Sequence, residues 1–223
     1  MSNMLNDKPL FIITNNFYNF LLVNLLFMIS NIIFLHINFF TSISFNSALV
    51  FMVSFIPMGP ALGAAFYAMG KLQREKEISP IKDYFRGYRQ NFKTSLMFWI
   101  PQLIIVYLLF GNYYHITRTG EFSVFILLTI VLLVFVLTLN LYAFPVMVRF
   151  EMSAKNLWII SILYFFKHWK ITFLNFTTLV SFAIIYFQFP FISLLFLASI
   201  IPFLIMMNLR LLLAEIEENG SAF

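Results

Sequence analysis

Residues 57–93 read PMGPALGAAFYAMGKLQREKEISPIKDYFRGYRQNFK, and this stretch decides how the chain is arranged. Its first part is apolar and rich in small residues, whereas residues 71–93 hold seven lysines and arginines. Lysine and arginine are retained on the cytoplasmic side of a bilayer, so a membrane helix that ends in a basic segment fixes its own orientation. We therefore expect residues 57–70 in the membrane and residues 71–93 on the cytoplasmic side.

The composition of the whole chain is that of an integral membrane protein. Of its 223 residues, 61% are hydrophobic and 10% are charged, and the mean hydropathy is +0.90. Soluble domains average roughly 25% charged residues. The formal charge of +5 comes from basic residues that cluster beside apolar runs. We expect a lipid bilayer around the protein and no nucleic-acid partner.

Residue types that carry catalysis or bind metals are scarce. The chain has no cysteine, and its three histidines, His36, His115 and His168, are far apart in sequence. The nine acidic residues lie almost entirely in expected loops and tails. Convergent acid, base or metal groups are what an active site requires. We expect no metal, no cofactor and no catalytic residues, and therefore a protein that is not an enzyme.

The hydropathy pattern predicts an all-α fold, a polytopic membrane helix bundle that forms a single membrane domain over residues 1–223. A run of about 20 apolar residues crosses a hydrocarbon core that is roughly 30 Å thick. About six transmembrane helices are expected, at residues 17–40, 45–70, 94–110, 122–148, 171–187 and 191–213. Two cytoplasmic interfacial segments are expected at residues 80–93 and 151–168.

The distribution of basic residues predicts the topology. Seven lysines and arginines lie in residues 71–93 and four in residues 149–170, whereas the predicted outer loops contain only Arg118. This asymmetry places both termini in the cytoplasm and the protein in the plasma membrane as a multi-pass protein. The acidic tail, residues 214–223, is expected to be cytoplasmic and partly disordered.

Polar side chains inside the spans are expected to join helices. Asn24 and Asn31 are seven residues apart, which places them on one face of the first span. An unpaired amide is costly in lipid, so we interpret both as interhelical hydrogen-bonding residues. Asn140 is expected to be hydrogen-bonded within the bundle.

The second span is interrupted by prolines, which predicts a kink or a break into two half-helices near Pro57 and Pro60. After the break, Gly59 and Gly63 form a small-xxx-small pattern that lets two helices approach closely. Transporters also build solute sites from the free backbone groups of broken helices. Close packing and a solute site therefore both remain open for this break.

An amphipathic helix is predicted to follow the pair Ser79 and Pro80, since serine is a common helix cap and proline suits the first helical position. Aromatic and basic residues alternate around this helix with helical spacing. It either anchors a basic loop on the lipid or docks another protein. The residues assigned to this partner or lipid surface are Tyr84, Phe85, Arg86, Tyr88 and Arg89.

The stretch from Gly59 to Ser95 resembles the signature of the YesL family of bacterial membrane proteins. The resemblance rests on the GPA motif followed by a small-residue helix, a basic loop and an Asn-Phe-Lys segment. The corresponding signature residues are Gly59, Pro60, Ala61, Gly63, Asn91, Phe92 and Lys93. The resemblance implies a bacterial membrane and an association with carbohydrate ABC-type transport, and it transfers no catalytic residue.

Two functions are compatible with these features. The first is a non-enzymatic accessory or regulatory component of carbohydrate ABC-type uptake, with a transporter component as its partner. The alternative is a small permease for a neutral solute such as a sugar or oligosaccharide, with the broken second span lining its path. The sequence does not specify an oligomeric state.

Overall fold

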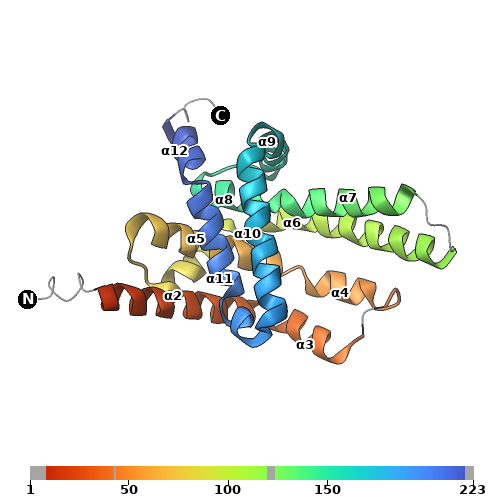
Figure 1. The fold of residues 1–223 in the computed structure, drawn as a ribbon, viewed down its shortest axis with the longest axis horizontal. Coiled ribbons are helices and arrows are strands. Elements are labelled where there is room, and N and C mark those ends of the chain that lie inside the picture. The colour runs from red at the N-terminus through yellow and green to blue at the C-terminus, as the bar shows by residue number, and fades with distance from the viewer. Residues whose placement is uncertain (1–8, 43, 120–123, 219–223) are drawn as a thin grey trace, which may run out of the picture.

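The computed structural model describes residues 9–42, 44–119 and 124–218, and within these ranges the chain is helical with short connections and no strand. The predicted all-α fold is confirmed (Figure 1). The helices are α2 (Pro9–Ser30), α3 (Ile32–Phe40), α4 (Ala48–Ser54), α5 (Met58–Glu75), α6 (Pro80–Thr119), α7 (Val124–Thr138), α8 (Asn140–Arg149), α9 (Ala154–Lys167), α10 (Trp169–Gln188), α11 (Pro190–Asn208) and α12 (Arg210–Glu218).

Six helical stretches are long and apolar enough to cross a membrane, and the protein is a multi-pass membrane protein. Large apolar side chains on their outer faces are exposed, as a lipid environment permits. The hairpin of α10 and α11 runs across the direction of α6 and α7 (Figure 1). The six stretches are Ile12–Ser30, Ala48–Glu75, Pro80–Arg118, Val124–Arg149, Trp169–Gln188 and Pro190–Asn208.

Several predicted spans are interrupted by short breaks. Residues 17–40 divide at Asn31, whose amide nitrogen donates to the Phe27 carbonyl oxygen at 2.8 Å. Residues 122–148 divide at Leu139, beside Asn140, whose amide donates to the Leu137 carbonyl oxygen at 2.9 Å. Asparagine that bonds to nearby backbone competes with the helix ladder. Both amides thus bond within their own segment. The interhelical hydrogen bond expected from the Asn31 amide nitrogen is therefore wrong, whereas Asn140 is hydrogen-bonded within the bundle, as expected.

Residues 80–93 belong to one uninterrupted helix with the following span, so the predicted boundary at Thr94 does not exist. Helix α6 has 40 residues and is about 60 Å long at about 1.5 Å per residue. Its first turn is fixed by Asp83, whose carboxylate accepts a hydrogen bond from the Ser79 backbone N–H at 2.9 Å. The first proline inside the helix is Pro101. The amphipathic segment therefore continues as a helix directly into the membrane span.

Helices α5 and α6 form an antiparallel pair in which small residues receive large ones. A Cβ atom on Gly59 would lie 2.7 Å from the Trp99 Cβ, and one on Gly87 would lie 2.5 Å from the Tyr67 Cβ. Later residues of α5 face earlier residues of α6, as in any antiparallel pair. The small residues let the two backbones lie close together along this contact. Successive facing pairs are Gly59 with Trp99, Gly63 with Ser95, Tyr67 with Gly87, and Lys71 with Asp83.

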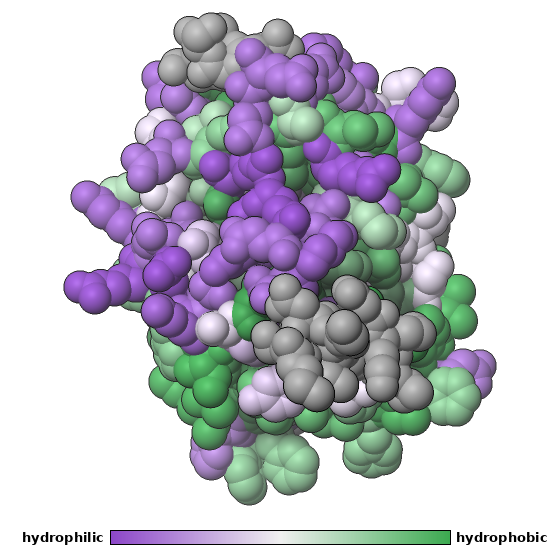
Figure 2. Space-filling view, turned by 90° about the vertical axis from the view of Figure 1, so that its left-hand side faces the viewer, coloured by the Kyte–Doolittle hydropathy of each residue, from purple (hydrophilic) through white to green (hydrophobic). Residues whose placement is uncertain are grey.

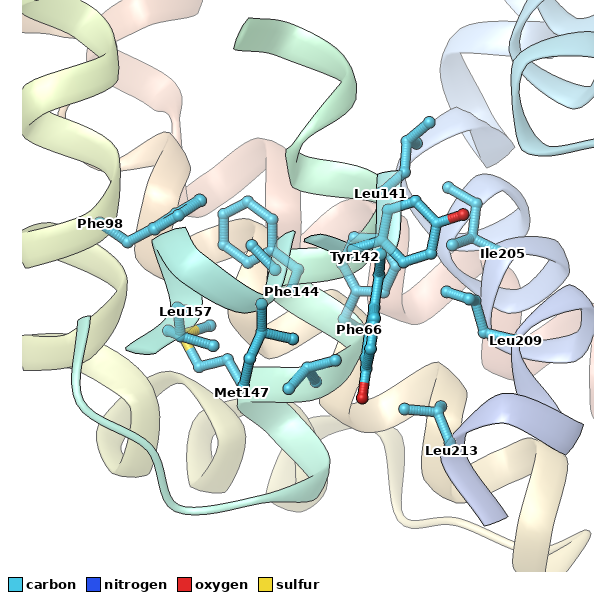
Figure 3. Packing of buried hydrophobic residues seen from close by; sticks show 14 of the residues in the cluster. Phe66, Phe98, Leu141, Tyr142, Phe144, Met147, Leu157, Ile205, Leu209 and Leu213 are labelled. Carbon is cyan, nitrogen blue, oxygen red and sulfur yellow. The ribbon is translucent and has the colours of Figure 1, made fainter. Parts of the chain in front are cut away.

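The largest buried cluster is centred on α8, in which residues 141–147 are all buried. Figure 3 shows Phe144 and Met147 beside Phe98 of α6 and Leu157 of α9, and Tyr142 beside Ile205 of α11. The Tyr142 hydroxyl lies 2.7 Å from the hydroxyl of Thr172. Helix α8 thus joins the α5–α6 pair to the carboxyl-terminal helices.

Helix α2 is joined to α11 by the side chain of Asn24. Its amide nitrogen donates to the Leu194 carbonyl oxygen at 2.8 Å, and its amide oxygen accepts from the Ala198 backbone N–H at 2.9 Å. Asn24 is therefore an interhelical hydrogen-bonding residue, as its position in the span predicts.

Candidate functional site

The proline break of the second span is closed by Trp99. The indole Nε1 donates a hydrogen bond to the carbonyl oxygen of Phe55, the residue that follows α4, at 2.9 Å. The same side chain packs on Gly59 and is buried. A carbonyl that the break releases is thus satisfied by a neighbouring helix. This geometry favours close packing over a solute site at the break.

A polar cavity of about 550 Å³ lies where α5 and α6 meet the end of α8. Its lining combines amide and hydroxyl groups from α5 and α6 with a positive side chain at the end of α8, Arg149, and a negative side chain just after it, Glu151. The cavity sits between the two inner basic segments of the sequence. Its lining residues are Tyr67, Gln90, Asn91, Thr94, Met147, Val148, Arg149, Phe150, Glu151 and Met152.

The surface around this cavity carries much of the positive charge of the molecule. Hydrophilic residues gather on the face that Figure 2 shows, which is the left-hand face of Figure 1, where α5 ends and α6 begins. We call this face the basic end. Its exposed lysines and arginines on α5 and α6 are Arg74, Lys82, Arg86, Arg89 and Lys93.

Arg149 on the cavity wall is paired with the carboxyl-terminal helix. Its guanidinium donates a hydrogen bond to the Glu217 carboxylate, and Leu212, Leu213 and Ile216 bury the apolar face of α12. Residues 214–218, expected as a disordered tail, therefore belong to a docked amphipathic helix, while residues 219–223 lie outside the described residues. The apolar face of α12, rather than its acidic composition, determines its structure.

The docking of α12 should depend on pH. The hydrogen bond from Arg149, and then its charge, lowers the pKa of Glu217. The ion pair therefore stabilises the docked position of α12 fully above the pH at which a free glutamate ionises. This stabilisation is lost as the pH falls through the lowered pKa of Glu217. A nitroxide on Leu211→Cys, the only thiol because the chain has no cysteine, should report slow motion at pH 7. Its motion should become faster as the pH is lowered step by step below the usual glutamate pKa of about 4.3.

Two matched glutamine variants separate the loss of this ion pair from other effects of low pH on the protein. Glu217→Gln should give the fast spectrum at pH 7, whereas Glu218→Gln, one residue further along, should leave the wild-type spectrum unchanged. An unchanged spectrum in Glu217→Gln would contradict the role of the pair.

An exposed apolar stripe runs along the first part of α6. Ile81, Phe85 and Phe92 are 54%, 53% and 44% exposed. At about 100° per residue these three side chains fall within about 40° of one another. Basic residues flank the stripe on one side, and the contact with α5 lies on the other. The stripe ends at a shallow groove lined by Phe92, Lys93, Leu96, Met97, Ile100 and Pro101.

Tyr84 is not part of this surface, and its assignment as a partner or lipid contact is wrong. Its side chain is fully buried against α2 and α5, and its hydroxyl donates to the Ser30 hydroxyl at 3.1 Å. Tyr88 is half-buried, whereas Phe85, Arg86 and Arg89 are exposed. The helical face that carries Tyr84 is turned toward the bundle because Gly87 and Asn91 on the same side contact α5.

The signature residues divide into three groups. Gly59, Pro60, Ala61 and Gly63 are buried in the α5 contact, Asn91 lines the polar cavity, and Phe92 and Lys93 point to the exposed groove. The structure therefore brings them together on one helix pair, but not into one site.

Other parts of this region are absent from the sequence-based prediction. They include Tyr67 and Arg149 of the cavity wall, Trp99 at the break, and Gly87 opposite Tyr67. Gly87 had a recognisable signal, since glycine inside a helix costs about 1 kcal/mol relative to alanine and implies a close approach. Within the described residues, no group of three His, Cys, Asp or Glu side chains could hold a metal ion.

Comparison with known proteins relates the α5–α6 pair to one family. No curated protein and no solved structure matches the chain at a significant level. Residues 20–113, less than half of the chain but including the whole of α5 and most of α6, match the family model described as "Protein of unknown function, DUF624".

Proposed function

We propose that this protein is a non-enzymatic accessory or regulatory component of a carbohydrate ABC-type uptake system. The basic end would face the cytoplasm of a bacterial cell, with both termini on that side of the plasma membrane. The assignment to the YesL family is part of this proposal, and the matched segment, which contains all the signature residues, supports it. The partner would be a component of the transporter.

The observation that carries the proposal is the exposed apolar stripe on the first part of α6, which we place beyond the bilayer. From Lys93 to Arg118, the helix is long enough to cross a hydrocarbon core roughly 30 Å thick. Residues 80–92 then project about 20 Å further at about 1.5 Å per residue. Exposed Ile81 and Phe85 beside Arg86 and Arg89 have the aromatic and arginine composition of protein interfaces.

The polar cavity supports a regulatory role at the same end. Its α6 residues Gln90, Asn91 and Thr94 lie on the side of the helix that faces α5, away from the stripe. The cavity is bordered by Arg149, which holds α12 in place. A ligand in the cavity that contacted Arg149 would compete with Glu217 and so alter the docking of α12. The cavity therefore offers a route by which ligand binding would change the surface that α12 forms.

The permease alternative receives less support. Trp99 fills the break that would line a path, and the polar cavity is confined to the junction of α5, α6 and α8. Purified protein in liposomes should therefore give no flux of labelled oligosaccharide above that of empty vesicles. Flux above that level would favour the permease and contradict the accessory function.

Uptake in the native bacterium tests the proposal. Deletion of the gene should reduce uptake of a carbohydrate, and the double variant Phe85→Ala with Phe92→Ala should reduce it to the level of the deletion strain because the stripe is lost. The control is Phe187→Ala with Phe191→Ala, which removes two rings that are more exposed, at 83% and 86%, from either side of the α10–α11 turn. Normal uptake in the deletion strain, or in the stripe variant at normal protein level, would refute the proposal.

A further inference from the structure

A wide apolar groove of about 790 Å³ lies between α7, α9 and α10, on a part of the protein that the proposed function does not use. Its walls include Val134 and Phe135 of α7, Phe165 and Phe166 of α9, and Trp169 and Phe173 of α10. Phe166, Trp169 and Phe173 are each about two-thirds exposed, so the groove is open along its length. Hydrocarbon fits such a lining, and water does not.

Positive charge borders this groove where α9 meets α10. The Lys170 ammonium lies 5.9 Å from the centre of the Trp169 ring, and Lys167 follows Phe166 directly in the chain. Both lysines are exposed. His168 lies between the two lysines in the chain, and the charges of both Lys167 and Glu215 of α12 act on it.

We propose that this groove binds an anionic phospholipid, with its acyl chains along the aromatic walls and its phosphate beside Lys167 and Lys170. Basic pockets between membrane helices bind anionic headgroups in this way, and tryptophan prefers the interface between headgroups and hydrocarbon. A zwitterionic lipid would fill the same walls but gain less from the lysines. The charges of Lys167 and Lys170, and not the apolar walls, thus determine the preference for an anionic over a zwitterionic lipid.

Tryptophan quenching measures this preference directly. The chain has three tryptophans, of which Trp99 is buried, Trp158 is half-buried and Trp169 is 66% exposed. The full-length protein is reconstituted in phosphatidylcholine vesicles with either brominated phosphatidylglycerol or brominated phosphatidylcholine. Subtracting the signal of Trp169→Phe isolates quenching at the groove. Phosphatidylglycerol should bind at least about five-fold more tightly, as expected from about 1 kcal/mol for a lysine near the surface.

Lysine variants test whether Lys167 and Lys170 cause the preference for phosphatidylglycerol over phosphatidylcholine. Lys167→Gln with Lys170→Gln should abolish it, whereas Lys155→Gln, at the opposite end of α9, should preserve it. Lys170→Gln alone, expected to weaken the preference, serves as the test if the double variant does not reconstitute. Equal binding of the two lipids, or a preference that survives the loss of the lysines, would overturn the proposal. Absence of quenching by either lipid together with dimers in light scattering would also overturn it, because a second copy would then occupy the groove.

Discussion

Replacing Gly87 by alanine lowers the stability of the protein, although alanine is the better helix former. A Cβ at this position would lie 2.5 Å from the Cβ and 2.7 Å from the Cγ of Tyr67, which is too close for carbon atoms that are not bonded to each other. The backbone fixes the position of the Tyr67 Cβ, so a rotamer change, which moves only Cγ and the ring, cannot relieve the closest contact. Helix α5 must therefore shift away from α6. Overpacking of this kind costs about 1–3 kcal/mol, against a gain of about 1 kcal/mol in helix propensity.

Gly111, in the same helix, provides the matched control. A Cβ there would meet only the edge of the Phe45 ring, at 3.7 Å, which is an ordinary contact. Gly111→Ala should therefore retain or raise the apparent melting temperature in detergent, while Gly87→Ala should lower it. Equal melting temperatures for the two variants would show that α5 and α6 are not as close as described.

Replacing Asn24 by leucine is the second change with a large expected effect. The Asn24 side chain bonds to two backbone groups of α11 that lie four residues apart, the Leu194 carbonyl and the Ala198 N–H. Those two groups can pair with each other when the amide is lost, so the cost is the lost link between helices. Interhelical hydrogen bonds in membranes contribute about 1–2 kcal/mol in model peptides. The free energy of unfolding in mixed micelles should fall by that amount.

Asn31→Leu is the control for this prediction. Asn31 is as buried as Asn24, but its amide nitrogen donates within its own segment, to the Phe27 carbonyl oxygen, and its amide oxygen has no hydrogen-bond partner. Its replacement should be neutral or stabilising, since an unsatisfied buried group is removed. A larger loss for Asn31→Leu than for Asn24→Leu would refute the assignment of Asn24 as the interhelical link.

Hydropathy and small-residue spacing predicted the helical class, the number of apolar stretches and the close approach at Gly59 and Gly63. These features are local, since they depend on length, composition and residues four apart. The first turn of α6 was also predictable, because Ser79 and Pro80 begin a helix by their own backbone preferences.

The orientation of individual side chains was not predictable in the same way. Tyr84 and Phe85 are adjacent and similar, yet one is buried and the other exposed, because the approach of α5 at Gly87 determines which face is covered. The central position of α8 in the buried cluster could not be predicted from the sequence, for a related reason. Nearly every residue of a membrane helix is apolar, so periodicity does not reveal which side faces protein and which faces lipid.

The polar cavity depends on three segments that are distant in the chain. Asn91 was singled out, but Tyr67 and Arg149 reach the same cavity only because α5, α6 and the end of α8 converge there. The pairing of Arg149 with Glu217 has the same origin, since 68 residues separate the two. Tertiary contacts of this kind have no signal in a single sequence.

Site-directed photocrosslinking in native membranes tests the central claim that the projecting part of α6 meets a transport protein. A photoreactive amino acid would replace Phe85, which is 53% exposed on the stripe, or Phe187, which is 83% exposed on the α10–α11 turn. We predict that irradiation links position 85, and not position 187, to a component of a carbohydrate ABC-type transporter, identified by mass spectrometry. Crosslinks to lipid alone at both positions would contradict the account.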